Sequence, residues 1–356
     1  MIDKVIVNAR FLAQRLTGVQ RFSMELSLQL KRILGDKVIF VSPYNIIQTE
    51  IARSLDVKVI GKYTGYLWEQ IELPLWLKCH GTPKLLNLCN VAPLYYRNNY
   101  VTIHDITWVR YPNAYSSMFR MIYNFMIQRL CHNAKHLFTV SEFSHSEISH
   151  YYRIPLKKIS VIYNAVDNKF SPVVDGQLRN EHYFVAVSSL KENKNFPVVL
   201  ESFKRLQKRL PKVKLYIIGD LQDKNFRTVD LEEYMQDPQI RFLGRVSDED
   251  LIRYYSNAIA FIFPSFYEGF GLPVLEAQAC GCPVISSNCS SLPEVLHKSG
   301  LYNSPLDING FIDKMIQLAT DDVLRTGLIQ QGFENIKRFS WENSAKRLSI
   351  LLSESF

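Results

Sequence analysis

Short apolar runs alternate with stretches of helical periodicity along the whole chain. In the first half, runs rich in Val, Ile, Leu and Phe lie at residues 5–8, 38–41, 57–60, 85–88, 101–104 and 137–140. A second series lies at residues 183–187, 214–218, 241–244, 259–263 and 283–286. Strands that alternate with helices form parallel sheets. The pattern therefore predicts an α/β protein with two doubly wound, Rossmann-like parallel sheets.

The length and one polar segment indicate where this pattern divides. Single hydrophobic cores stop growing at about 250–300 residues, and the chain has 356. Residues 171–180 are polar, contain Pro172 and Gly176, and separate the two series, as expected of a linker. We predict an N-terminal domain over residues 1–170, a C-terminal domain over residues 171–340 and a last helix over about residues 341–356.

Composition and cysteine usage are typical of an ordinary globular protein. Hydrophobic residues make up 47% of the chain and aromatic residues 12%, which does not indicate disorder. The six cysteines show neither the spacing of a disulfide framework nor that of a zinc site. No apolar run approaches the ~20 residues of a membrane-spanning helix, and no leader pattern precedes the first strand. We expect a cytoplasmic protein.

Charge is distributed unevenly between the two halves. Residues 1–170 contain 21 Lys and Arg against 11 Asp and Glu, a net charge of +10, whereas residues 171–356 contain 21 against 23, a net charge of −2. A basic surface suits an anionic membrane or a pyrophosphate-bearing acceptor, although scattered solvated lysines give the same count. No nucleic-acid recognition motif accompanies it, so we expect no nucleic-acid partner. The aromatic-rich residues 63–76 suit core packing or, alternatively, contact with an acceptor lipid or a membrane.

The segment 258–277 has the features of an anion-binding turn. An apolar run predicts a buried strand, two glycines permit a tight turn after it, and Pro273 suits the first position of a helix. The free N–H groups of a helix start attract anions. The pattern places Glu276 in the first turn of that helix and Glu268 on the preceding turn. Alternatively, Glu276 only complements the helix dipole and Glu268 is a solvated loop charge.

The two glutamates and the residues around them resemble a known motif. Glu268 and Glu276 enclose Gly-Phe-Gly-Leu-Pro-Val-Leu, and residues 279–285 and 292–295 continue the match. Together they resemble the two-glutamate motif of the retaining family-4 glycosyltransferases, which have the GT-B fold, and the resemblance runs from about residue 5 to 350. It implies that Glu276 hydrogen-bonds the donor ribose and that Glu268 contacts hydroxyls of the donor sugar. The backbone implied to lie against the sugar and diphosphate is that of Gly269, Phe270, Gly271 and Leu272.

A second loop resembles the family's first glycine loop. It follows the first predicted strand, opens a helix and consists of Thr17, Gly18, Val19 and Gln20. The resemblance implies a role in binding the acceptor or a phosphate, with one glycine where the family usually has two. A lone glycine also suits simple turn chemistry, and the lack of Gly-x-Gly-x-x-Gly argues against a dehydrogenase.

Polar residues that follow two other strands complete the candidate site. His104 follows the run 101–103, and the resemblance implies that it reaches the donor sugar and the reaction centre; the alternative is a structural histidine. Asp105 is expected to orient the loop that follows.

Lys194 matches the lysine of a basic pair that holds the donor diphosphate in this family. The usual arginine is missing, since Ser189 or Asn193 occupies its position, and Lys191 is a possible substitute. A lysine provides charge without the planar fork of an arginine, so bidentate phosphate recognition is not assured. A solvated loop lysine is the alternative interpretation of Lys194.

Residues 242–246 resemble the base-binding loop of the family, which places Val246 at the donor. The acidic run that follows, Asp248 to Asp250, is not interpreted as a metal motif. Ser247 and Asp250 stand three residues apart just before a helical pattern, which is typical of a helix cap.

The resemblance implies transfer of a sugar from a nucleotide diphosphate to an acceptor hydroxyl with retention at the anomeric carbon. No cofactor and no metal are expected, because Lys194, the helix start near Leu272 and Pro273, and backbone amides can meet the charge of the leaving diphosphate. No well-placed carboxylate nucleophile is evident in the sequence, which favours front-face displacement. The last helix, which opens near Ser340, resembles the helix that crosses back onto the first domain in GT-B enzymes.

The expected partners are a nucleotide sugar and a lipid-linked or oligosaccharide acceptor. GDP-mannose is the favoured donor, and O-antigen or capsule assembly the favoured setting. The basic N-terminal half favours docking on the cytoplasmic face of the inner membrane. Two alternatives are a non-catalytic sugar-nucleotide or polysaccharide-binding protein, and a sugar-nucleotide epimerase on the same fold.

Overall fold

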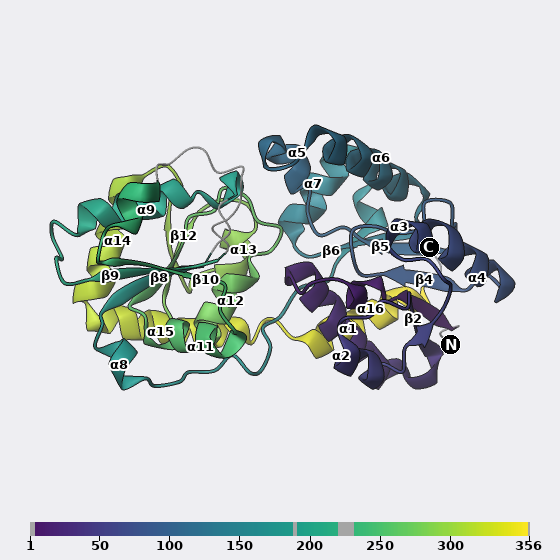
Figure 1. Ribbon diagram of the computed structural model, residues 1–356, viewed down its shortest axis with the longest axis horizontal. Helices are drawn as coiled ribbons and strands as arrows, with labels where there is room; N and C mark the ends of the chain where they lie inside the picture. The colour runs from purple at the N-terminus through teal and green to yellow at the C-terminus, as the bar shows by residue number, and fades with distance from the viewer. Residues whose placement is uncertain (1–3, 188–190, 220–230, 355–356) are drawn as a thin grey trace. The chain divides into compact units, whose positions relative to one another are not determined.

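The structure, a computed structural model, describes residues 4–187, 191–219 and 231–354. The chain forms two compact units, each built around one sheet (Figure 1). The first consists of Met1–Val109, Ser117–Asn164 and Ser340–Phe356, and the second of Arg110–Ser116 and Ala165–Phe339. Arg110–Ser116 belongs with the second unit because the ring of Tyr111 lies 6.4 Å from that of Phe266 and 6.0 Å from that of Tyr267.

In the described part of the first unit, seven strands form a sheet in which every neighbouring pair is parallel. The strand order is β3-β2-β1-β4-β5-β6-β7. The strands are β1 (Val5–Asn8), β2 (Val38–Ser42), β3 (Lys58–Val59), β4 (Lys84–Asn87), β5 (Asn99–Thr102), β6 (His136–Thr139) and β7 (Ile159–Val161). Strands β1, β5 and β6 are buried along their whole length, as expected where helices cover both faces of a parallel sheet.

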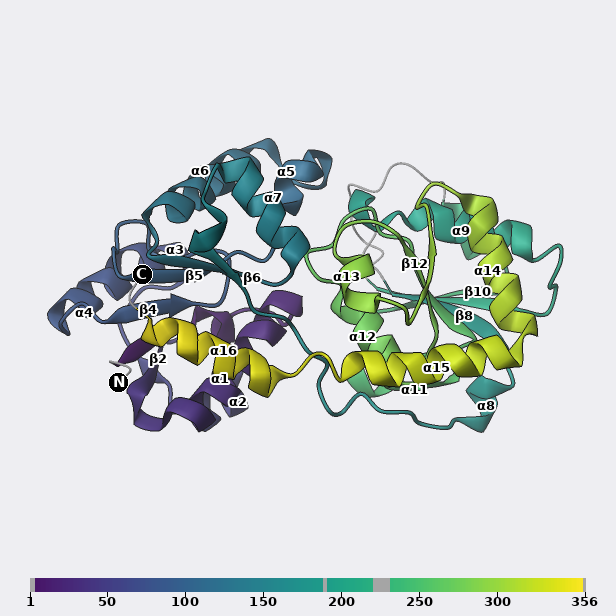
Figure 2. The same ribbon diagram turned by 180° about the vertical axis from the view of Figure 1, so that it is seen from behind.

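Helices α1, α2 and α16 lie on one face of this sheet and α6 and α7 on the other (Figures 1 and 2). A π-helical turn, Trp68–Glu72, separates α3 from α4. The helices are α1 (Gly18–Leu34), α2 (Thr49–Ser54), α3 (Gly65–Leu67), α4 (Leu73–Cys79), α5 (Thr107–Arg110), α6 (Ser117–Asn133), α7 (Glu142–Tyr152) and α16 (Trp341–Ser353).

The helix α16 returns from the end of the chain to the first unit, where it lies beside α1 (Figure 2). The ring of Trp341 meets the buried ring of Phe22 edge-on at 5.9 Å. Ser340 caps the helix, since its Oγ accepts a hydrogen bond from the N–H of Asn343 at 3.3 Å. The first unit therefore needs this last helix to complete its core.

In the described part of the second unit, six strands form another fully parallel sheet, in the order β10-β9-β8-β11-β12-β13. They are β8 (Tyr183–Val187), β9 (Lys214–Ile218), β10 (Ile240–Gly244), β11 (Ala260–Phe263), β12 (Val284–Ser287) and β13 (Leu301–Asn303). The helices are α8 (Gly176–Arg179), α9 (Phe196–Leu206), α10 (Leu231–Met235), α11 (Asp248–Asn257), α12 (Leu272–Ala279), α13 (Leu292–Leu296), α14 (Ile308–Thr320) and α15 (Asp322–Ile336).

Both faces of the second sheet are buried, which explains its continuous apolar strands. On one face, Phe184 and Ala186 of β8 join a core with residues of α9 and α14. On the other face, Tyr183 stacks on Tyr216 of β9, with ring centroids 4.3 Å apart. Alternate side chains of one strand thus serve two different layers of helices.

Each sheet has one point at which the strand order reverses direction. In the first sheet this point lies between the neighbours β1 and β4, and in the second between β8 and β11. Chain connections leave such a pair of strands toward opposite sides, and ligands of open α/β sheets bind there, beyond the carboxyl ends of the strands. We call these two places the first and the second switch point.

Three details differ from the sequence predictions. Strands β7 and β13 were not predicted, and β5 starts at Asn99 rather than at residue 101. The predicted linker, residues 171–180, contains the short helix α8, whose start is capped by the side chain of Asp175. A polar, Pro-bearing segment can hold one helical turn when a good N-cap residue precedes it.

Candidate active site

The loops that follow β8 and β11 bring Lys194 and Glu268 together at the second switch point. Lys194 ends a 3₁₀ turn, Glu192–Lys194, and Glu268 lies in the loop before α12. The Lys194 Nζ donates to both carboxylate oxygens of Glu268, at 2.7 and 2.9 Å. The two side chains are 21% and 10% exposed, so the pair is shielded but reachable from solvent. Two site residues that the sequence predicted in distant parts of the chain therefore form an ion pair.

Two asparagines tie the loops together behind this pair. The Asn193 side-chain nitrogen Nδ2 donates to the Tyr267 carbonyl at 3.0 Å, and the backbone carbonyl of Asn193 accepts from the Phe266 N–H at 2.8 Å. Asn195 has φ of 54°, a left-handed conformation that asparagine adopts more readily than most residues. Its amide donates to the carbonyls of Pro264 and Pro305 at 3.1 and 2.6 Å. These clamps hold Lys194, which lies between them, in place.

The sequence left open what replaces the missing arginine. Asn193 is 4% exposed and uses its amide nitrogen on a carbonyl, so it is a scaffold residue in this structure. Ser189 lies outside the described residues. The ammonium of Lys191 lies over the ring of Tyr115, 5.2 Å from its centroid, and a role on the diphosphate stays a prediction for this lysine.

The glutamate loop is held by the segment that leads into α13. The Glu268 N–H donates to Ser290 Oγ at 3.0 Å, and the Ser291 hydroxyl lies 3.0 and 2.9 Å from the carbonyl oxygens of Glu268 and Phe270. Gly271 has φ of 95°, and a Cβ at this position would stand 2.8 Å from Leu292 Cδ2. Gly271 is therefore required both for its backbone conformation and for its close approach to α13.

Helix α12 begins at Leu272, directly after Gly271, and has Pro273 at its second position. Glu276 is consequently the fifth residue of the helix. Its predicted place in the first helical turn is wrong, because the helix begins at Leu272, one residue before Pro273. Glu276 is 7% exposed. Burial and, secondarily, the nearby Glu276 charge raise the pKa of Tyr255 far above its ordinary value. The carboxylate is thus held in the interior beside α11 rather than on the surface.

The loop after β10 carries Val246, which is half-buried, and Gly244, which has φ of 67°. The predicted helix cap after it is confirmed, since Ser247 Oγ accepts from the Asp250 N–H at 3.1 Å. Asp248 forms an ion pair with Lys169 at 2.7 Å. The acidic run therefore starts helix α11.

In the first unit, His104 lies two residues beyond the end of β5 and is 7% exposed. Its Nε2 stands 2.9 Å from the Leu88 carbonyl oxygen, which can only accept, so Nε2 carries the hydrogen and Nδ1 is an acceptor. Burial lowers the pKa of His104, and the ring is neutral at pH 7. Asp105 orients its loop as predicted, because its Oδ1 accepts from the Thr107 N–H at 2.9 Å.

The predicted glycine loop starts helix α1 at Gly18. The Thr17 hydroxyl bonds the Gln20 side chain, and the Gln20 amide donates to Gln14 Oε1 at 2.8 Å. A Cβ at Gly18 would meet nothing within 4 Å. Packing does not require glycine there, and the space that a Cβ of residue 18 would occupy is open to solvent or ligand.

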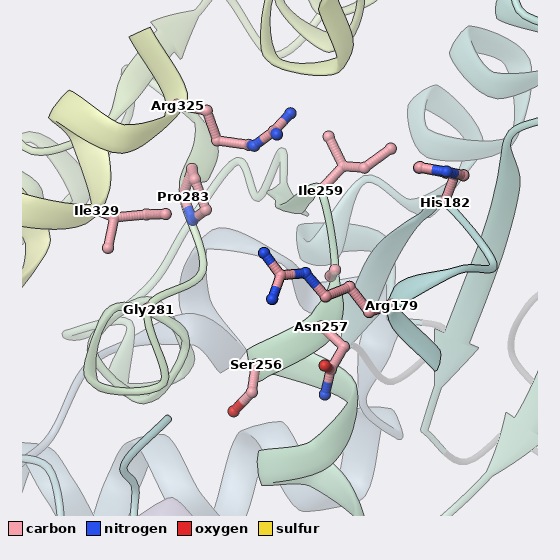
Figure 3. Close-up of a pocket in the computed structure, with 10 residues that line it drawn as sticks. Arg179, His182, Ser256, Asn257, Ile259, Gly281, Pro283, Arg325 and Ile329 are labelled. Atoms are coloured by element: carbon pink, nitrogen blue, oxygen red, sulfur yellow. The ribbon is translucent and has the colours of Figure 1, made fainter. Parts of the chain in front are cut away.

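Figure 3 shows a hollow of about 270 Å³ in the second unit, away from these residues. His182, Ile259 and Pro283 line it, and each directly precedes a strand of the sheet, β8, β11 and β12. The hollow therefore lies at the amino ends of the strands, whereas Lys194 and Glu268 lie beyond the carboxyl ends. None of the predicted site residues lines it.

Two parallel-sheet Rossmann-like domains with polar residues beyond the carboxyl ends of the strands are the architecture of GT-B glycosyltransferases. The structure of Anabaena Alr3699/HepE in complex with UDP and glucose superposes with a TM-score of 0.74, over 99% of this chain and 100% of that chain, at 14% identity. This likeness confirms the predicted fold class.

Sequence comparison gives the family. Residues 16–170 match the model of Glycosyltransferase Family 4, and residues 171–335 match that of Glycosyl transferases group 1. The chain belongs to this glycosyltransferase family, as the two-glutamate motif predicted.

Two curated relatives come from bacterial O-antigen assembly. O-antigen chain mannosyltransferase B of Escherichia coli is 34% identical over 68% of this chain and 66% of its own length, so the match spans just under two thirds of that protein. O-antigen chain mannosyltransferase RfbU of Salmonella typhimurium is 27% identical over 99% of this chain and 100% of its own length. No helix of the described residues is long and apolar enough to cross a membrane.

Proposed function

We propose that the protein transfers mannose from GDP-mannose to an acceptor hydroxyl in O-antigen assembly, with retention at the anomeric carbon. The observation that carries the proposal is the Lys194–Glu268 pair at the second switch point, next to the start of α12. Mannose and the O-antigen setting are supported by the names of the two relatives.

The predicted residues of the second unit have these roles in donor binding under this proposal. Glu276 binds the ribose hydroxyls, Glu268 binds hydroxyls of the sugar, and the backbone from Gly269 to Leu272 lies against the sugar and diphosphate. The Val246 loop faces the base. An ammonium has three N–H donors, so Lys194 can retain one hydrogen bond to Glu268 while it donates to a phosphate oxygen.

The chemical step follows from the charges that this site offers. The bond between the anomeric carbon and the phosphate oxygen breaks, and the acceptor oxygen bonds to the same face of the sugar. The acceptor proton passes to the leaving phosphate oxygen. Lys194 and the N–H groups at the start of α12 stabilise the negative charge that develops on the diphosphate, so no metal ion is required.

The acceptor side of the proposal involves an anionic membrane surface. Helix α6 exposes Met118, Met121, Ile122 and Phe125 at 70%, 70%, 50% and 56%. The helix contains Arg120 and Arg129 and no acidic residue. An apolar stripe flanked by arginines suits the interface of an anionic leaflet, where a lipid-linked acceptor is held.

An assay of the purified protein with GDP-mannose and a mannose-terminated lipid-linked oligosaccharide tests the proposal. We expect an α-linked product by NMR, because the donor is α-configured, and unchanged activity in EDTA. A β-linked product would contradict retention, and a loss in EDTA that manganese restores would contradict metal independence. Binding of GDP-mannose without transfer or hydrolysis would favour a non-catalytic binding protein, and sugar inversion without an acceptor would favour an epimerase.

A further inference from the structure

The first switch point carries a buried polar cluster that contains none of the predicted site residues. Asn8 and Asn87 are the last residues of β1 and β4 and face each other in the strand register. The Asn8 amide nitrogen donates to Asn87 Oδ1 at 2.9 Å and to Glu69 Oε1 at 2.8 Å. The cluster thus joins the two strands at the edge where ligands bind in this type of sheet.

Glu69 brings a carboxylate into the interior of this cluster. It comes from the π-helical turn Trp68–Glu72 and is 1% exposed. Its Oε1 accepts from Asn8 and from Arg10 Nε, at 2.8 and 3.0 Å, while its buried Oε2 has no hydrogen-bond partner among the residues that the structure describes. A buried carboxylate is costly unless it is paired, and π-helical turns are frequent at functional sites. Arg10 is the cation that pairs with it.

Arg10 is fixed from behind and has an unused outer edge. Its Nε is bound to Glu69, and its guanidinium lies over the ring of Tyr66, 5.2 Å from the centroid. The side chain is only 12% exposed, yet neither of its two Nη atoms bonds any of the described residues. Two parallel N–H donors held in one plane match the oxygens of a phosphate group.

The surroundings of Arg10 show from where a ligand would approach. The hollow between Arg10, Glu69 and Gln14 measures about 10 Å³, which is too small for a ligand larger than one water molecule. Gln14 in turn bonds Gln20 of the glycine loop at 2.8 Å. An anion would therefore meet the outer edge of Arg10 beside residues 17–20 rather than enter the cluster.

We propose that Arg10 binds a diphosphate group and that Glu69, with Asn8, is the positioning residue that aims its guanidinium. The proposal rests on the proposed function, which supplies two diphosphates: that of a lipid-linked acceptor and that of the nucleotide donor. Both present the same oxygens to Arg10, and direct binding measurements separate them.

The test is calorimetry with three probes, namely inorganic pyrophosphate, farnesyl diphosphate and GDP, on the full chain. Arg10→Gln should weaken binding by about 10- to 100-fold for the probe that Arg10 recognises, as expected for lost charge-assisted hydrogen bonds. A loss for farnesyl diphosphate alone assigns the site to the acceptor, and a loss for GDP alone to the donor. The control Arg53→Gln removes an exposed arginine of the same unit, on α2, and should change none of the three affinities.

Two further variants distinguish a lost binding contact from misfolding, and a positioning role of Glu69 from a packing role. Arg10→Lys keeps the charge beside Glu69 but lacks the planar fork, so it should stay folded and still lose affinity. Arg10→Gln/Glu69→Gln should bind no worse than Arg10→Gln alone, because Glu69 acts only through Arg10.

Affinities within twofold of the wild type in folded Arg10→Lys and in the double variant, for all three probes, would overturn the proposal. An additive loss in the double variant would overturn the positioning role of Glu69. Because binding is measured without turnover, a protein that fails to transfer mannose can still pass or fail this test.

Discussion

Each switch point carries an ion pair between a glutamate and a basic side chain, but the two pairs differ in how deeply the glutamate is buried. At the first switch point, Glu69 is 1% exposed and accepts one hydrogen bond from Arg10, through Nε. The two Nη atoms of Arg10 bond none of the described residues. At the second, Glu268 is 10% exposed, and the ammonium of Lys194 contacts both of its oxygens. A buried carboxylate can only orient its partner, whereas a reachable one can itself touch a ligand. Under our two proposals, the same position in the two sheets aims a cation in the first and contacts the sugar directly in the second.

The largest expected effect is on stability and separates the two pairs. Arg10→Gln leaves the interior charge of Glu69 unpaired and should lower the free energy of unfolding by about 3–5 kcal/mol. Lys194→Ala should cost less, about 1–3 kcal/mol, because water can reach Glu268. Urea denaturation followed by circular dichroism measures both, and Arg10→Gln/Glu69→Gln should recover most of the first loss. A larger loss for Lys194→Ala than for Arg10→Gln would break the comparison.

The next effect is on turnover and concerns the second pair. Lys194→Ala should lower the transfer rate by at least ~100-fold, since it removes the cation that we propose stabilises the leaving diphosphate. Glu268→Gln should lower turnover more than GDP affinity, because its contact is with the sugar. Lys204→Ala on α9 is the matched control, as Lys204 is exposed, forms an ion pair with the surface residue Glu233 and lies over the ring of Tyr234. A near-normal rate for folded Lys194→Ala would remove this lysine from the mechanism.

A third, smaller effect concerns pH and the first unit, which contains two buried histidines. Burial lowers the pKa of His136 to about 4, and it also lowers that of His104. The unfolded chain binds these protons near pH 6.5 and the folded chain only at lower pH, so the stability contribution is complete above pH 6.5 and is lost as the pH falls toward 4. Because of His136 alone, we expect the free energy of unfolding to fall by about 2 kcal/mol between pH 7 and pH 5.

Urea midpoints at pH 7 and pH 5 check this expectation. His136→Asn should flatten the pH dependence, whereas His182→Gln, which changes an exposed histidine of the second unit, should leave it unchanged. A pH dependence equal to that of the wild type in His136→Asn would contradict the assignment.

The smallest expected effect of a single residue is on the free energy of membrane binding. Each arginine near an anionic surface contributes about 1 kcal/mol, and salt screens the attraction. Arg120→Ala/Arg129→Ala should reduce sedimentation with phosphatidylglycerol vesicles at low salt, and Lys208→Ala/Arg209→Ala in the second unit should not. Equal binding to neutral and anionic vesicles would leave the charge difference between the halves without this role.

The sequence was sufficient for the two sheets because parallel strands buried on both faces are apolar throughout. It failed at one edge of each sheet, where β7 and β13 are only three residues long and contain a polar side chain, Ser160 in the middle of β7 and Asn303 at the end of β13. It located Lys194 and Glu268 through motif resemblance. Their contact was not predictable, since it depends on the strand order that makes β8 and β11 neighbours.

The first cluster was missed for a related reason. Asn8 and Glu69 are 61 residues apart and Asn8 and Asn87 are 79 apart, and a single sequence gives no sign that they meet. One signal was available: Asn8 is the last residue of the run 5–8 and Asn87 the last but one of the run 85–88, where a polar side chain lies near the ligand-binding edge of a parallel sheet. Glu276 was misplaced by one residue along the helix, because the helix starts at Leu272, directly after the left-handed Gly271, and not at Pro273.

The return of α16 to the first unit has a consequence for synthesis on the ribosome. Domains generally fold as units, the N-terminal one first, while the chain is still being made. Here one ring partner of Phe22 is Trp341, which is translated only after the whole second unit. The part of α1 that packs against α16 therefore stays uncovered until almost the entire protein has been synthesised. Ribosome-bound chains that end before residue 340 are accordingly expected to be more sensitive to proteases in the first unit than in the second.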